Sequence, residues 1–420
     1  MPGLSTESVR VCVIGGGPAG LMTGLLLARS GVDVLVLEKH PDFLRDFRGD
    51  TVHTSTLLAM NELGLAEEFL ALPHVELPQL PMATATGPVV FADFSALPGP
   101  FPFVAFMPQW DVLNFLAEAA RRYPGFRLVQ EAEVTELVQR DGTVVGARAQ
   151  TPDGPVQITA DLVIAADGRH SIVRRSGLLE VAASAAPMDV LWFRVSKPEG
   201  ERLPTVRSGK GFFIVCIDRG DYLQVAYMIP KGGFATIRTA GLARFRADLA
   251  AIYPALAPHL DAEISDWGDV KPLDVRVDRL RRWYRPGLVA IGDAAHAMSP
   301  AGGVGINLAV QDAIAAARLL APILTTGATA TTAQLRAIQR RREFPMRVVQ
   351  FAQLHLLADL YPSAGRAATD KPLLVRLLRR FPRLPRLVAR VIGLGVRPEP
   401  VPPAMTSTGT TSALTKLREN

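Results

Sequence analysis

Apolar runs and a helical pattern alternate at the start of the chain. Residues 9–14 and 32–37 consist mainly of Val, Leu and Ile, which predicts two buried strands. Residues 21–29 between them have the composition of a helix. Two later apolar runs, at 161–166 and 288–291, have the same strand-like character. Buried strands separated by helices indicate an α/β fold with a Rossmann-like parallel sheet.

The middle of the chain has a different pattern, in which turn residues separate short strands. Residues 127–158 predict a β-meander, because Asp-Gly and Pro-Asp-Gly turns interrupt the apolar runs. Residues 180–270 predict mainly an antiparallel sheet, with a helix at 240–256. Seven prolines punctuate residues 73–102, which predicts short strands that leave the first domain.

The C-terminal third has a helical pattern. A helix is predicted at 308–320, and further helices, broken at Pro345, Pro362, Pro382 and Pro385, follow to about residue 393. We therefore expect a discontinuous nucleotide-binding domain, an inserted antiparallel-sheet domain for the substrate, a helical region and a disordered tail. The nucleotide-binding domain comprises residues 1–75, 103–179 and 271–330, and the inserted sheet domain comprises residues 76–102 and 180–270. The helical region is 331–404, and the disordered tail is 405–420.

Three glycines follow the first predicted strand at a spacing that indicates phosphate binding. Gly15 permits a tight turn, Gly17 lets the backbone approach a pyrophosphate, and Gly20 lets the helix pack closely on the strand. The start of that helix offers unpaired N–H groups to the phosphates. Glu38, 18 residues after Gly20, ends the second strand and is placed to accept hydrogen bonds from a ribose. Together these features predict a dinucleotide site.

Composition narrows the class of protein. The 420 residues are 48% hydrophobic, which suffices for a large core, and no apolar run reaches the ~20 residues of a membrane span. With no signal peptide visible, we expect a cytoplasmic protein without an integral membrane segment. Cys12 and Cys216 lack metal-site spacing, so we predict no metal. The net charge of +6 is diffuse, which argues against nucleic acid as a partner.

Three motifs occur in order: the glycine triplet, Asp167-Gly168 and Gly292-Asp293. Over about residues 9–325 they resemble the FAD-dependent aromatic hydroxylases, the single-component monooxygenases of the para-hydroxybenzoate hydroxylase type. The resemblance implies a bound FAD, with NADPH or NADH and O2 as co-substrates. It implies hydroxylation or epoxidation of an aromatic, polyketide, quinone-precursor or antibiotic-like small molecule through a flavin C4a-hydroperoxide. No second glycine triplet is present, which favours transient docking of the nicotinamide.

The resemblance also implies which residues hold FAD. Glu38 binds the adenosine ribose, Arg48 the phosphate region, Val134 the adenine through its backbone, and Gln109 and Asp293 the ribityl chain. The flavin ring lies beside the loop that ends at residue 307. The full set of expected contacts is Gly15, Gly17, Pro18, Ala19, Gly20, Glu38, Lys39, Arg48, Gln109, Val134, Asp167, Gly168, Asp293, Pro300, Gly302, Gly303, Val304, Gly305, Ile306 and Asn307.

For two of these segments, residues 302–305 and 167–168, physical chemistry gives an interpretation that does not depend on the resemblance. Glycines at 302, 303 and 305 expose backbone N–H groups, and the following helix directs its positive end toward them, which stabilises the negative charge of a reduced flavin. Asp167-Gly168 has two interpretations. It is a turn with an N-cap at Ser171, or it supports FAD and NAD(P)H directly.

The substrate is expected against strands that cover the flavin. The candidates there are Trp192, Arg194, Phe212, Gln224, Tyr227 and Met228. Trp192 and Arg194 share one face of a strand, and Arg194 could pair with a phenolate or carboxylate, although sheet-core aromatics and a surface arginine explain the pattern equally well. Arg194, Tyr227, His296 and Pro300 are the catalytic candidates, none of them certain. His296 is either a general base or a packing residue.

Two alternatives from other classes remain at this point. The first is another flavin oxidoreductase on the same scaffold, a halogenase or prenyl reductase, although the Trp-x-Trp-x-Ile-Pro signature of flavin halogenases is absent. The second is a non-redox ligand-binding protein of this fold. A homodimer is left open. The basic amphipathic stretch 371–381 either packs on its own domain or rests on a membrane surface.

Overall fold

The computed structural model describes residues 5–44, 51–182, 186–198, 206–209, 212–356 and 373–406. Its first layer is an eight-stranded sheet. The strands are β1 (Ser5–Ile14), β2 (Val34–Leu37), β8 (Phe126–Val129), β9 (Glu133–Arg140), β10 (Thr143–Thr151), β11 (Gly154–Ala165), β19 (Tyr284–Arg285) and β20 (Leu288–Ala290). The central order is β19-β20-β11-β1-β2-β8, and β10 and β9 pair successively beyond β11.

The register of this sheet confirms the predicted α/β fold. β1 pairs in parallel with β2 and β11, so that Val11 lies opposite both Val34 and Leu162. β9 and β10 are antiparallel additions, as the predicted meander requires. One difference is that β11 is a single long strand, because the apolar run at 156–158 continues without a break into 161–165.

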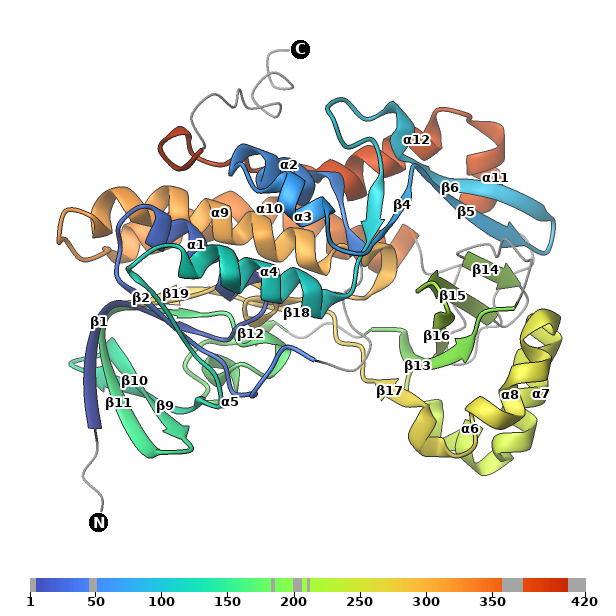
Figure 1. The fold of residues 1–420 in the computed structure, drawn as a ribbon, viewed down its shortest axis with the longest axis horizontal. Helices are drawn as coiled ribbons and strands as arrows, with labels where there is room; N and C mark the ends of the chain where they lie inside the picture. Colours follow the sequence, from blue (N-terminus) through green and yellow to red (C-terminus); the bar gives the residue numbers. More distant parts are fainter. Residues whose placement is uncertain are drawn as a thin grey trace.

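Long helices cover one side of the sheet (Figure 1). They are α1 (Pro18–Arg29), α4 (Gln109–Arg121), α9 (Gly305–Leu324) and α10 (Thr332–Phe351). α1 packs against both α4 and α9, and α10 packs against α9. The expected break at Pro345 is wrong, because α10 continues through it. Pro345 and Met346 are buried there, and this packing offsets the lost backbone hydrogen bond.

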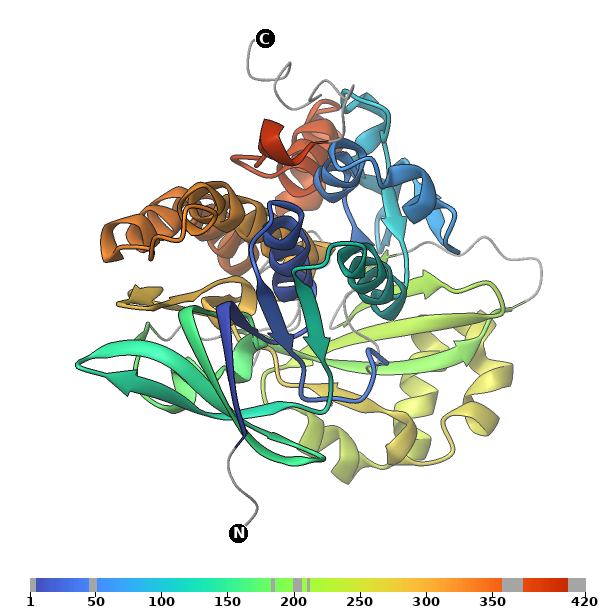
Figure 2. The same cartoon turned by 60° about the vertical axis from the view of Figure 1, so that its left-hand side comes forward.

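A second, seven-stranded sheet forms the other half of the molecule (Figure 2). Its order is β17 (Lys271–Leu273), β13 (Met188–Ser196), β16 (Tyr222–Pro230), β15 (Phe212–Asp218), β14 (Val206–Gly209), β5 (Gln79–Thr84) and β6 (Gly87–Asp93). Segments from both sides of residue 103 therefore build one sheet. Three helices cover its outer face: α6 (Phe234–Ala240), α7 (Leu242–Ile252) and α8 (Ala257–Glu263). The helix expected at 240–256 is α7, which Gly241, with φ +93°, separates from α6; α7 ends at Ile252, and a 3-10 turn, Pro254–Leu256, follows it.

Short elements link the two sheets. They are α2 (Thr54–Glu62), α3 (Ala66–Leu70), α5 (Ile172–Arg175), β3 (Thr51–Val52), β4 (Val75–Leu77), β7 (Val104–Phe106), β12 (Val181–Ala182), β18 (Asp278–Leu280) and β21 (His296–Ala297). Two C-terminal helices, α11 (Leu373–Arg380) and α12 (Leu384–Ala389), pack on β6. Of the expected disordered tail, Met405 is buried, and residues 407–420 lie outside the described residues.

One segment of the described chain, Ala301–Leu324, is long and apolar enough to cross a membrane. Within that segment, 83% of the most apolar window is buried inside the protein. The burial follows from its position, since α9 packs between α1 and α10. A core helix of a large domain has these properties.

Candidate active site

The glycine turn after β1 has the geometry that the motif predicts. Gly15 has φ +103°, and a Cβ there would lie 2.6 Å from the Ala166 carbonyl oxygen. A Cβ on Gly20 would lie 1.9 Å from the Gly15 oxygen. The first close approach joins this turn to the end of β11, so the first two motifs are in contact.

The third motif meets the first at the interface of two helices. A Cβ on Gly292 would lie 3.0 Å from the Ala19 Cβ in α1 and 3.6 Å from the Ala309 Cβ in α9. The Gly-Asp turn is therefore held between α1 and α9 close to their N-termini. Segments that are far apart in the sequence converge on one site.

Both helix N-termini face open space. A Cβ added to Gly17, the residue before α1, or to Gly305, the first residue of α9, would meet no atom within 4 Å. The first N–H groups of a helix have no partner within it and carry partial positive charge. The two glycines thus leave room for negatively charged groups beside two sets of N–H donors. This arrangement fits the pyrophosphate and the flavin ring of FAD.

Glu38 lies beside the glycine turn, as predicted. Its Oε2 accepts a hydrogen bond of 2.8 Å from the Gly16 N–H, and its Oε1 accepts one of 3.1 Å from the His40 N–H. The carboxylate is buried, whereas Lys39 is exposed. Arg48, the expected phosphate contact, lies outside the described residues.

Asp293 is held in place through its backbone. The Arg174 guanidinium donates to the Asp293 and Ala294 carbonyl oxygens and forms an ion pair of 2.6 Å with Asp278. The Asp293 side chain itself is exposed, although protein surrounds it on most sides. Desolvation by that protein raises the pKa of the carboxyl, an effect that its access to solvent moderates. An exposed carboxylate next to Gly292, which lies between the starts of α1 and α9, is placed to bind a hydroxyl-rich chain.

The Asp167 carboxylate is hydrogen-bonded to neighbouring groups of the protein. It accepts hydrogen bonds from the Ser171 hydroxyl at 2.5 Å and from the Ile172 N–H at 2.7 Å. Burial raises the pKa of this carboxyl. Ser171 in turn caps α5 through the Val173 N–H. These contacts favour the turn and N-cap interpretation for the side chain, while Gly168, with φ +78°, shapes the turn.

The flavin-side loop differs from the sequence expectation in one respect. The helix was expected to begin at residue 308, but α9 begins at Gly305, so Ile306 and Asn307 belong to its first turn. Pro300 opens a tight turn in which Gly302 has φ +79° and Gly303 has φ +61°. A Cβ on Gly303 would lie 2.4 Å from the Thr51 Oγ1, so this turn packs directly on β3.

The structure adds His53, which the sequence analysis did not identify. Its Nε2 lies 2.9 Å from the Gly302 carbonyl oxygen, which can only accept, so Nε2 carries the proton. Burial lowers the pKa of the imidazole to about 4, so the ring is neutral at ordinary pH. The Asn307 Oδ1 accepts from the His53 N–H and from the Thr56 hydroxyl. The His53 Nδ1 and the Asn307 Nδ2 are buried without a hydrogen-bond partner among the described residues.

His296 is a packing residue. Its Nε2 lies 2.6 Å from the Asp312 Oδ2, and its ring packs 4.9 Å from that of Trp283. Asp312 also accepts from the Gly292 N–H and the Arg342 Nε. Burial alone would raise the pKa of the Asp312 carboxyl, but His296 and Arg342 outweigh it and hold that pKa below its usual value. The burial of His296 in this cluster favours the packing interpretation over a general base.

The substrate candidates divide between two faces of the second sheet. Trp192 and Met228 belong to the apolar cluster that includes α1 and α9, and Gln224 lies on the same face by strand alternation. Trp192 is buried, and its Nε1 has no partner among the described residues. Arg194 shares this face but is exposed and stacks on the Tyr222 ring at 4.8 Å.

Tyr227 and Phe212 do not share that face. Tyr227 packs toward the helices of the outer layer, with its ring 6.1 Å from that of Phe245 in α7. Phe212 is two and four residues before Ile214 and Cys216 in β15, so strand alternation places its side chain on the same outer side. This placement argues against contact of these two residues with a substrate on the inner face, and against a catalytic role for Tyr227. A strand places successive side chains on opposite faces, and their sequence does not reveal which face is inward.

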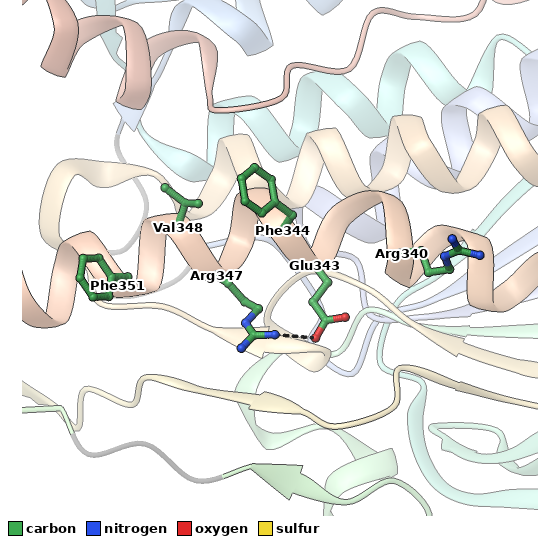
Figure 3. A pocket seen from close by; sticks show the side chains of 6 residues that line it. All are labelled: Arg340, Glu343, Phe344, Arg347, Val348 and Phe351. Carbon is green, nitrogen blue, oxygen red and sulfur yellow. Dashed lines mark ion pairs between the residues drawn. The ribbon is translucent and has the colours of Figure 1, made fainter.

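Two shallow hollows are lined by residues other than those of the glycine turn and the first turn of α9. One, of about 390 Å³, is lined by Val134 and its neighbours on β9 and by Arg175, so it adjoins the expected adenine contact. The other, of about 490 Å³, lies on the exposed face of α10, where Figure 3 shows Phe344 and Val348 on one side and the Glu343–Arg347 pair on the other. None of the predicted site residues lines this second hollow. Gln109, the expected ribityl contact, is the first residue of α4.

The comparisons with known proteins agree with this geometry. The FAD binding domain family matches residues 8–352. The chain is 31% identical to 6-methylpretetramide 4-monooxygenase of Streptomyces rimosus over 91% of both chains. It is 27% identical to para-nitrophenol 4-monooxygenase of Pseudomonas sp. (strain WBC-3), over 80% of this chain and 83% of that one.

The fold is also that of a solved monooxygenase. The crystal structure of p-nitrophenol 4-monooxygenase PnpA from Pseudomonas putida DLL-E4 matches with a TM-score of 0.74 at 23% identity, over 93% of this chain and 98% of that chain. With open space at two helix N-termini, three converging motifs and these relatives, the chain belongs to the FAD-dependent aromatic hydroxylase-like family and is an FAD-dependent monooxygenase.

Proposed function

We propose that this chain hydroxylates a fused-ring aromatic polyketide, with NADPH or NADH as reductant and O2 as oxidant. The observation that supports this most directly is the apolar inner face of the second sheet. There Trp192 and Met228 belong to the same buried apolar cluster as Ala19 at the start of α1 and Ile306 at the start of α9. A flat apolar face with few polar groups suits a flat, mainly apolar substrate. The relative from Streptomyces rimosus, whose name records 6-methylpretetramide, supports the substrate class.

The chain's own residues have three tasks in such a reaction. The α1 N-terminus binds the pyrophosphate, Glu38 the adenosine ribose and Asp293 the ribityl chain. The first turn of α9 directs its N–H groups at the flavin ring, where they stabilise the negative charge that reduction creates. When bound, FAD takes two electrons from the nicotinamide and uses O2 to place one oxygen atom on the substrate and the other in water.

The second sheet positions the substrate and excludes water. Trp192 offers a buried Nε1–H that lacks a partner among the described residues, so it can donate to a substrate oxygen. Met228 and Phe213 add apolar surface on the same face. Orientation of the reacting carbon and exclusion of water are the main protein contributions that this chemistry needs.

The test is the oxidation of NADPH and NADH by the purified protein with FAD, with hydrogen peroxide assayed in parallel. Phenols, quinones and tetracycline-like polyketides form the panel. We expect a fused-ring polyketide to accelerate NAD(P)H consumption without a matching rise in peroxide. Stimulation by simple phenols alone would contradict the substrate class. If neither nicotinamide reduces the flavin with any compound, the proposed reaction itself fails.

A further inference from the structure

The C-terminal helices carry an exposed apolar stripe. Leu373, Leu377 and Phe381 are spaced four residues apart and are 55%, 36% and 53% exposed. The Phe381 N–H donates to the Leu377 carbonyl oxygen, so the helical turn extends to Phe381. Leu387 in α12 is 57% exposed. These four account for almost half of the nine large apolar side chains that are exposed among the described residues.

The stripe is not the side of α11 that packs on the rest of the protein. The opposite side of α11 is already buried, through Val375 and Leu378 at 2% and 4% exposure. α11 and α12 both pack on β6, at the edge of the second sheet (Figure 1). Two arginines secure this contact: Arg379 donates to the Thr86 carbonyl oxygen at 2.7 Å, and Arg386 lies 3.5 Å from Asp93. The stripe therefore faces outward from a fixed position.

Positive charge is concentrated on the same segment. Residues 373–398 contain seven arginines and no acidic residue, whereas the whole chain carries a net charge of +6, so the rest of the chain is slightly negative. Four of these arginines are exposed and form no ion pair with a described residue: Arg376, Arg380, Arg383 and Arg390. We call these four, with Leu373, Leu377, Phe381 and Leu387, the α11–α12 surface.

The arginines of this segment favour an anionic partner over a second copy of the chain. If two copies of the chain met through this surface about a two-fold axis, arginine would face arginine, with no acidic residue between 373 and 398 to pair with it. Anionic lipid headgroups supply many phosphates, which guanidinium groups bind in a forked geometry. Leucine and phenylalanine side chains enter the boundary between headgroups and acyl chains, while the arginine stems extend along it.

We propose that the α11–α12 surface docks on the surface of an anionic lipid bilayer. The four apolar side chains insert at the acyl boundary, and the four arginines bind headgroup phosphates. Docking of this kind leaves the protein outside the membrane and attaches it by the edge of the second sheet. It is independent of the redox chemistry.

The test is sedimentation of the full-length, FAD-loaded protein with vesicles. Binding is compared between phosphatidylcholine vesicles and vesicles of phosphatidylcholine and phosphatidylglycerol in equal parts. We expect binding to the anionic vesicles only, weakened by salt. R376Q/R380Q/R383Q/R390Q should lower the partition coefficient by about fivefold per arginine, more than a hundredfold in all. R140Q/R238Q/R244Q/R282Q removes the same charge from exposed sites elsewhere and should lower it far less.

A second variant separates docking from simple charge attraction. L373S/L377S/F381S/L387S keeps every arginine, and we expect it to bind at least about tenfold more weakly than the wild type. Unchanged flavin content and melting temperature show that each variant is folded. Equal vesicle binding by the serine variant and the wild type would overturn the proposal. So would absence of binding to the anionic vesicles, which would leave the surface to an acidic protein.

Discussion

His53 fixes the loop at which the flavin ring is expected. Its Nε2–H holds the Gly302 carbonyl oxygen, and its backbone N–H holds the Asn307 side chain. One residue thus ties the turn before α9 to the first turn of α9. The ring must remain neutral to do so without a buried charge, which its lowered pKa ensures.

This neutrality makes stability depend on pH. The imidazole titrates at about 6.5 in the unfolded chain but at about 4 in the fold, so the unfolded state binds the proton first as pH falls. The contribution of His53 is fully present above about pH 6.5 and is lost between there and about pH 4. We expect it to remove about 2 kcal/mol of unfolding free energy by about pH 5.

Urea unfolding of the FAD-free protein at neutral pH and at about pH 5 measures this effect. His53→Gln retains a donor for the Gly302 oxygen but does not titrate, so its stability should fall less than that of the wild type over this range. If the wild type and His53→Gln lose the same unfolding free energy between neutral pH and about pH 5, His53 is not the titrating group. His259, which is half-buried, provides the control through His259→Gln.

Gly305 gives a second prediction at this scale. A Cβ at this position meets no protein atom within 4 Å, and alanine favours a helix over glycine. Gly305→Ala should therefore leave the FAD-free protein at least as stable as the wild type. The same methyl group enters the space assigned to the cofactor, where overpacking costs about 1–3 kcal/mol, so the FAD dissociation constant should rise about tenfold to a hundredfold.

Thermal unfolding and a fluorescence titration with FAD measure the two quantities. Ala substitution of Gly31, which also faces open space but lies after α1, away from its N-terminus, should lower stability because φ there is +85°, yet leave FAD affinity unchanged. Full FAD affinity in Gly305→Ala would place the flavin elsewhere.

The residues found from sequence and those missed differ in the range of their interactions. Gly15, Gly20 and Glu38 could be predicted because the backbone at each position imposes its own requirement within one strand–helix–strand unit. His53 has no local signature. Its partners lie about 250 positions away, and only the folded chain brings them together.

At the scale of elements, alternation along β13 and β16 decides which side chains lie on the sheet face that packs toward α1 and α9. The sequence predicts both strands, but not which of their faces points toward α1 and α9. Trp192 and Met228 face inward, and Tyr227 faces α7. The start of α9 at Gly305 was missed for a related reason, because glycine has low helix propensity and the contacts of Asn307 with α2 override it.

The two faces predict different kinetics. Trp192→Phe removes the inward Nε1–H, and we expect KM for the substrate to rise by about tenfold, as for loss of one buried hydrogen bond. Tyr227→Phe removes only an outward hydroxyl and should leave KM and kcat unchanged. Steady-state kinetics with the compound found in the panel measure both. A larger effect in Tyr227→Phe than in Trp192→Phe would reverse the assignment of the faces.

At the scale of the whole molecule, a buried charge cluster joins the C-terminal segment to the helices behind the site. Arg342 in α10 pairs with Asp312 of α9 at 2.9 Å and with Glu399 at 3.5 Å. Arg341 pairs with the same Glu399 at 2.6 Å. The Val401 N–H also donates to the Glu62 carboxylate. The last described residues are therefore part of the fold, an arrangement that hydrophobic patterns alone do not predict.

Glu399→Gln should destabilise the protein by about 3 kcal/mol, because Arg318 and Arg341 lose their buried counter-charge and Arg342 keeps only Asp312. Glu343→Gln, which breaks the partly exposed pair with Arg347, is the matched control and should cost about 1 kcal/mol or less. Chemical denaturation of the two variants measures the difference. Equal stability of the two variants would show that the C-terminal segment contributes little to the fold.

The central claim is that this chain transfers one oxygen atom from O2 to a fused-ring aromatic substrate. Mass spectrometry of the product formed with FAD, NAD(P)H and isotopically labelled O2 tests it most directly. We expect one labelled oxygen atom per hydroxylated product and none from labelled water. A product without the label, or NAD(P)H consumption that yields only labelled peroxide with every fused-ring compound, would contradict it.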